Sequence, residues 1–97
     1  MNLALPIGSV VRLTAFDRYV MVTGVKQIEV ESDKKWDYCG CFYPQGVINS
    51  RELVLFDEAD IASFHFLGFR DGEGLMFQRH LLETGEMPSP PAQRGGE

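Results

Sequence analysis

A chain of 97 residues is long enough for one domain, and 44% hydrophobic and 11% aromatic residues place it outside the composition of disordered proteins. The net charge of −5 argues against a nucleic-acid partner, because tight binding to phosphates needs clustered Lys and Arg side chains. No apolar run reaches the ~20 residues that cross a bilayer, and the N-terminal sequence lacks the features of a secretory signal. We therefore expect a cytoplasmic protein that binds neither nucleic acid nor a membrane.

The first half of the chain predicts three strands. A short strand is expected over 10–13, and residues 19–25, rich in Val, Tyr and Thr, form the strongest strand candidate. A glycine near the end of that candidate predicts a bulge. Alternation of polar and apolar side chains over 27–30 extends the strand as a hairpin arm, and the charged run 31–35 forms the loop. Residues 36–43 return as the partner strand.

Cys39 and Cys41 are the only cysteines, and one glycine separates them. In a strand they point to the same face, and a disulfide between them would close a very tight, strained loop. A metal site needs more ligands than two thiolates, and His65 and His80 have no ligand-like spacing. We interpret both cysteines as reduced residues packed in the core, with a zinc or thiol site as the alternative.

After the third strand the sequence alternates turns with short elements. Residues 43–46 have the Pro and Gly composition of a turn, and strand candidates follow at 47–48 and 53–56. Asp57 offers an N-cap for one helical turn over 58–62.

A final strand is predicted over 64–69, apolar enough to be mostly buried, with Gly68 as a bulge. The acidic run 71–74 is interpreted as a flexible turn, because it lacks the further oxygen ligands of a calcium loop. A helix over 75–83 follows, and Gly85 is placed to end it. The apolar residues of this helix do not fall on one face, which predicts cover partly by the sheet and partly by another chain.

These elements predict a mainly β fold: a small, strongly bent antiparallel sheet or an SH3-like, partly open barrel, with a short C-terminal helix. No pair of strands is separated by a full crossover helix, which disfavours an α/β fold. Residues 1–86 are expected to form a single domain, and the Pro-rich and Gly-rich residues 87–97 a disordered tail.

The sequence contains no motif of a nucleophile elbow, a P-loop, a dinucleotide-binding turn or a zinc protease. It does place several aromatic residues in and beside the third strand, and so small a domain cannot bury all of them. Exposed aromatic residues are typical of protein interfaces. We therefore predict a protein-binding surface from these aromatics and two residues of the late helix: Trp36, Tyr38, Phe42, Tyr43, Phe77 and Leu81.

Two strings in the chain match a bacterial family pattern. The first is Leu-Pro-Ile-Gly-Ser-Val-Val at 5–11, continued by the strand segment 21–24. The second, over 36–46, follows Tyr-Asp-Tyr-x-Gly-x-x-Tyr-Pro-x-Gly, with Trp in place of the first Tyr. An acidic turn over 57–61 and an aromatic-Gly-aromatic end over 66–69 complete the match. The chain thereby resembles the family filed as domain of unknown function 4176, found beside LXG-type toxins in type VII secretion loci of Gram-positive bacteria.

This resemblance implies a non-enzymatic, cytoplasmic accessory or chaperone-like protein that binds an LXG-type toxin, or its helical companion proteins, before export. It does not imply an enzyme and carries over no catalytic residue, and we expect neither a cofactor nor a metal. Two alternatives stay open. One is a small metal-dependent or thiol-dependent enzyme built on Cys39, Cys41, His65 and His80, and the other is an immunity-type structural partner of the toxin.

Overall fold

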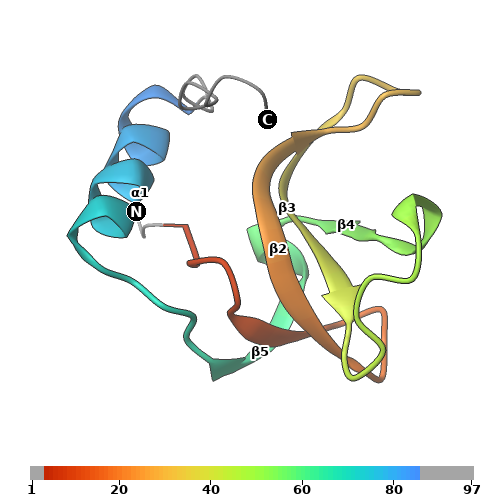
Figure 1. The fold of residues 1–97 in the computed structure, drawn as a ribbon. Helices are drawn as coiled ribbons and strands as arrows, with labels where there is room; N and C mark the ends of the chain where they lie inside the picture. Colours follow the sequence, from red (N-terminus) through yellow and green to blue (C-terminus); the bar gives the residue numbers. More distant parts are fainter. Residues whose placement is uncertain (1–3, 86–97) are drawn as a thin grey trace, which may run out of the picture.

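The structure, a computed structural model, describes residues 4–85. Five strands form one antiparallel sheet in the order β4-β3-β2-β1-β5, and one helix follows the last strand (Figure 1). Within the described residues the edge strands β4 and β5 do not pair, so the sheet stays open. The predicted mainly β fold with a short C-terminal helix is confirmed. The elements are β1 Val10–Leu13, β2 Tyr19–Ile28, β3 Lys35–Phe42, β4 Val54–Phe56, β5 Ile61–Phe66, α1 Gly72–Thr84 and two short 3₁₀ turns, η1 Ser50–Glu52 and η2 Glu58–Asp60.

The long hairpin of β2 and β3 gives the sheet its bend, and β2 curves visibly along its length (Figure 1). The pairing of the two strands shifts register between Val22 and Gly24, which confirms the irregularity predicted there. Lys26 adds a second kink, because its backbone adopts a left-handed φ of 51° within the strand. Such a conformation costs a non-glycine residue about 1 kcal/mol or more, so the surrounding hairpin must hold it in place.

The core includes a ring stack between Tyr38 and Phe56, with centroids 5.3 Å apart. Tyr38 is only 1% exposed, so the prediction that it is a surface aromatic is wrong. Cys39 and Cys41 are free and buried as predicted, but side chains alternate along β3 and place them on the face opposite Tyr38. The buried core residues are Val11, Leu13, Val20, Val22, Val25, Tyr38, Val54, Phe56 and Leu81.

The segment between β3 and β4 contains one strand fewer than predicted. Val47 and Ile48 form no strand and are exposed, because the side of β3 that a new strand could pair with is already taken by β4. Asn49 instead caps a 3₁₀ turn, and its Oδ1 accepts a hydrogen bond from the Arg51 amide at 2.9 Å. The strand predicted at 53–56 is confirmed as β4.

The fifth strand starts earlier and is less covered than predicted. It spans Ile61–Phe66 and pairs with β1, and Phe64 and Phe66 are exposed rather than buried. Gly68 lies beyond the strand, so it is not a strand bulge. It marks a close backbone crossing, where its amide donates to Ser9 Oγ at 3.0 Å.

Helix α1 begins earlier than predicted, since Asp71 is its N-cap and accepts a hydrogen bond from the Gly74 amide at 2.9 Å. The prediction of a flexible turn over 71–74 is therefore wrong, because these residues form the N-cap and the first turn of α1. Gly85 ends the helix with a φ of 71°, as predicted. No helix within residues 4–85 has both the length and the apolar character needed to span a bilayer. The tail predicted over 87–97 lies outside the described residues.

Candidate functional site

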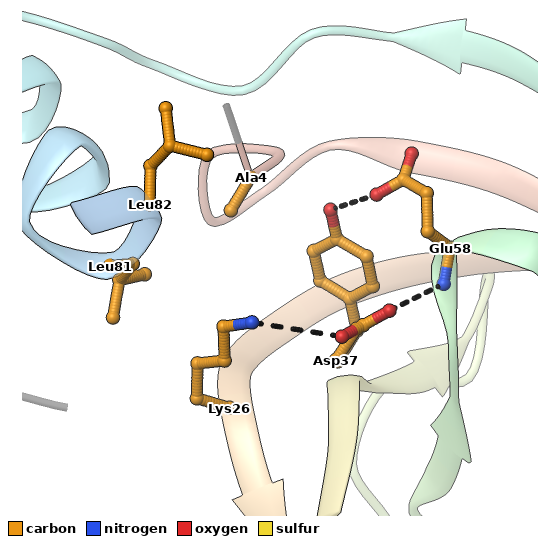
Figure 2. Close-up of a pocket in the computed structure, with 7 residues that line it drawn as sticks. Ala4, Lys26, Asp37, Glu58, Leu81 and Leu82 are labelled. Carbon is orange, nitrogen blue, oxygen red and sulfur yellow. Dashed lines mark hydrogen bonds and ion pairs between the residues drawn. The ribbon is translucent and has the colours of Figure 1, made fainter. Parts of the chain in front are cut away.

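An open pocket of about 150 Å³ lies between α1 and the β2–β3 hairpin (Figure 2). One wall is apolar and comes from α1 and the N-terminal segment, whereas the other wall is charged and comes from the sheet and η2. The side chains of Leu81 and Leu82 stand opposite those of Lys26 and Asp37 (Figure 2). The lining residues are Ala4, Lys26, Asp37, Tyr38, Glu58, Leu81 and Leu82.

Asp37 organises the charged wall by holding both the hairpin and the η2 turn. Its Oδ2 accepts a hydrogen bond from the Glu58 amide at 2.9 Å, and its Oδ1 lies 3.7 Å from Lys26 Nζ. Its own amide donates to Asp57 Oδ1 at 3.0 Å. Asp37 thus contacts both the kinked residue of β2 and the turn after β4. These contacts position Glu58 at the pocket.

Tyr38 lies at the floor of the pocket and joins three parts of the chain. Its hydroxyl donates to Glu58 Oε1 at 2.6 Å and accepts a hydrogen bond from the Leu5 amide at 3.0 Å. Burial of the ring, and next the hydrogen bond to the Glu58 carboxylate, raise the pKa of Tyr38 well above its usual value. The hydroxyl therefore stays protonated at neutral pH and serves as a hydrogen-bond donor, so the pocket combines a neutral polar floor with one apolar and one charged wall.

We expect the Tyr38 hydroxyl to make the fold sensitive to alkali. The pKa of Tyr38 is raised in the folded state, so its stabilising effect is complete below the unfolded value of about 10 and decreases as pH rises beyond that value. Free energies of unfolding measured by urea denaturation from neutral pH to about pH 11 should decrease more steeply in the wild type than in Tyr38→Phe. Equal pH profiles for the two proteins would contradict the assigned hydrogen bond.

Of the six predicted interface residues, the structure brings Tyr38 and Leu81 together at this pocket. Both are nearly inaccessible, at 1% and 2% exposure, so Leu81 is also a core residue and not a surface residue. Phe77 is half-buried and packs against the core from α1. The physical reason is that α1 turns its Phe77–Leu81 side towards the sheet, since residues four apart share one face.

The other three predicted residues are dispersed over the surface. Trp36 is half-buried, its Nε1 donates to Glu29 at 3.1 Å, and Lys34 Nζ lies 3.8 Å from its ring centroid. Phe42 is half-buried in an edge-to-face contact with a neighbouring aromatic ring. Tyr43 is exposed, as predicted.

The charged wall was not predicted from the sequence. The sequence predicted only that Asp57 is an N-cap, which is confirmed for η2, where Asp60 Oδ2 accepts a hydrogen bond from the Asp57 amide at 2.9 Å. The contact between Asp37 and Glu58 joins residues 21 positions apart. Asp37 stands between Trp36 and Tyr38 in the sequence, and this position was the one available signal for a charged wall beside the predicted aromatics.

The thiols and imidazoles proposed for the alternative enzyme do not form a metal site. No group of three or more His, Cys, Asp or Glu side chains in the described part of the chain is placed to hold a metal ion. The nearest partner of Cys39 is Thr23, with Oγ1 and Sγ 3.6 Å apart. His65 contacts Ser63 Oγ at 2.7 Å and the Tyr19 ring on the exposed face of the sheet.

Comparison with known proteins identifies the family of the chain. The family model described as a domain of unknown function, DUF4176, matches residues 4–77, which include the sheet, most of the pocket and the first half of α1. No curated protein and no solved structure matches the chain. The matched region covers well over half of the sequence, and the chain belongs to the DUF4176 family.

Proposed function

We propose that the protein is a non-enzymatic accessory or chaperone-like factor of the cytoplasm. Its partner would be an LXG-type toxin, or a helical companion of that toxin, that is exported by type VII secretion. The observation that supports this proposal is the exposed apolar surface of α1. Leu81 is the only one of its five large apolar residues that is buried, and Leu75, Met76 and Leu82 are exposed.

The exposed residues lie in a pattern that a partner helix can use. With 100° between successive helical residues, Leu75 and Leu82 fall on one side of α1, away from the side that Phe77 and Leu81 turn to the core. Leu82 also lines the pocket. A helix with an apolar stripe could cover the Leu75–Leu82 side and reach the pocket with one side chain, in the manner of helix-in-groove recognition.

The pocket restricts which side chain can enter. Its α1 wall is aliphatic, whereas Asp37 and Glu58 on the opposite wall carry negative charge that Lys26 only partly offsets. A side chain with an apolar stem and a basic or neutral polar tip matches both walls, and an acidic one is repelled by the carboxylates. The partner helix is therefore expected to present Lys, Arg or Gln at this point.

We expect a Leu75→Gln, Leu82→Gln double variant to bind the partner at least about tenfold more weakly than the wild type, because full burial of one Leu contributes about 1.5–3 kcal/mol. Glutamine is a good helix former, so α1 should persist. The measurement is co-expression and pull-down with the toxin and helical proteins encoded nearby, followed by calorimetric titration of the complex obtained.

Val30→Gln is the matched control, because Val30 is 90% exposed in the hairpin loop. Its affinity should equal that of the wild type. If the double variant binds the partner with unchanged affinity, the binding surface does not lie on the Leu75–Leu82 side of α1. If the chain forms no complex with any protein of its locus, the proposed function is wrong.

A further inference from the structure

The free edge of β5 is a second surface, distinct from α1. Within the described residues β5 has one neighbour, β1, so one row of its backbone amides and carbonyls faces away from the sheet. In Figure 1, β5 lies at the opposite end of the molecule from the end of α1. We propose that two copies of this chain associate through β5, edge to edge, and form a dimer with a continuous antiparallel sheet.

The edge lacks the charged residues and prolines by which proteins often prevent such pairing. Charged residues and prolines are the common protections of an edge strand, and the sequence Ile-Ala-Ser-Phe-His-Phe of β5 contains neither Pro nor Asp, Glu, Lys or Arg. Phe66 is 60% exposed and Phe64 is also exposed. The pairing of β5 with β1 contains two register shifts, so Ala62 and His65 have no paired residue on β1. A six-residue, uncharged, aromatic strand is long enough to pair with another strand.

The strand is also complementary to itself in an antiparallel arrangement. If the two-fold axis passes through Phe64, the two Phe64 residues lie opposite each other, and Ala62 of one copy faces Phe66 of the other. Ser63 then faces His65, so that each polar residue meets a polar residue. Aromatic pairs directly opposite each other on neighbouring strands are favourable. This symmetry favours a second copy over an unrelated strand.

The charges beside the strand support the antiparallel orientation. The acidic turn with Asp57, Glu58 and Asp60 precedes β5, whereas one basic and two acidic residues, Arg70, Asp71 and Glu73, follow it. Antiparallel pairing therefore brings the acidic turn of one copy towards the less acidic end of the other. A parallel arrangement would place the two acidic turns side by side, in a chain that already carries a net charge of −5.

Sedimentation equilibrium of the purified chain, without any partner, tests the proposal over about 1 μM to 1 mM, the range of weak to moderate association. We expect the mass to rise from 10.9 kDa towards twice that value. Phe64→Lys with Phe66→Lys should weaken dimerisation at least about tenfold. Ile28→Lys with Val30→Lys adds the same charge on exposed hairpin residues and should weaken it less.

Three results would overturn the proposal: a monomer at every concentration, a dimer that the Phe64, Phe66 variant leaves intact, or equal weakening by both double variants. If the wild type is monomeric and the Phe64, Phe66 variant loses its protein partner in the pull-down, the edge receives a partner strand and not a second copy. Should the double variant fail to fold, Phe66→Lys alone replaces it, because that side chain is exposed. None of these results depends on the α1 surface.

Discussion

Replacing Tyr38 by alanine is expected to lower the free energy of unfolding by about 3–5 kcal/mol, the cost of removing a large ring from a packed core. The ring is 1% exposed and stacks on Phe56. The substitution also removes the hydroxyl that joins Leu5 and Glu58 to β3. Because the whole stability of a small domain is about 5–15 kcal/mol, this variant should lose a large share of it.

Urea denaturation followed by circular dichroism measures this loss, and two variants separate its causes. Tyr38→Phe keeps the ring and should cost about 1–2 kcal/mol, since it leaves the Leu5 amide and the Glu58 carboxylate without their partner. Tyr43→Ala is the matched control, because Tyr43 is 58% exposed, and it should cost less than about 1 kcal/mol. If Tyr38→Ala costs no more than Tyr43→Ala, the assignment of Tyr38 to the core is wrong.

Gly68→Ala is expected to destabilise the fold by about 3 kcal/mol, which is a large effect for one methyl group. A Cβ at this position would lie 2.2 Å from the carbonyl oxygen of Ile7 and 2.9 Å from the amide nitrogen of Ser9. Both are backbone atoms, so no side-chain rotation can relieve the clash. The chain would have to move apart at the crossing and lose the hydrogen bond between the Gly68 amide and Ser9 Oγ.

Gly72→Ala is the matched control for this prediction. An added Cβ at Gly72 meets nothing within 4 Å, and the residue lies in the first turn of α1. Alanine there should raise stability by up to about 1 kcal/mol, because it favours the helix. Thermal unfolding of both variants is sufficient for the comparison, and similar midpoints would show that the crossing at Gly68 is looser than described.

The strands could be predicted from the sequence, but the side of β3 that faces the core could not. Four consecutive residues of β3, from Tyr38 to Cys41, are buried, so the alternation that usually separates a core face from a solvent face is absent. A cysteine pair and a pair of aromatics are both acceptable in a core. Tyr38 faces the core because it pairs with and stacks on Phe56 of β4. Sequence alone does not reveal that pairing.

The exposure of β5 and the charged wall of the pocket were missed for a related reason. Phe64 and Phe66 have the composition of a buried strand, and their exposure follows from the position of β5 at the sheet edge. That position depends on the order of all five strands. Likewise, Asp37 and Glu58 become neighbours only when the turn after β4 folds back onto β3. Local patterns predict elements, whereas edges and pockets depend on how the elements assemble.

The short N-terminal segment also has a consequence for the order of folding. The Ala4 carbonyl accepts a hydrogen bond from Gln78, 74 positions away, and the Leu5 amide bonds to Tyr38, 33 positions away. Ser9 meets Gly68 across 59 positions. Closing loops of this length costs more entropy than closing the β2–β3 hairpin, so we expect these contacts to form after the hairpin. We therefore expect the wall of the pocket formed by the N-terminal segment and α1 to be completed late in folding, after the hairpin that supplies Lys26 and Asp37 of the opposite wall.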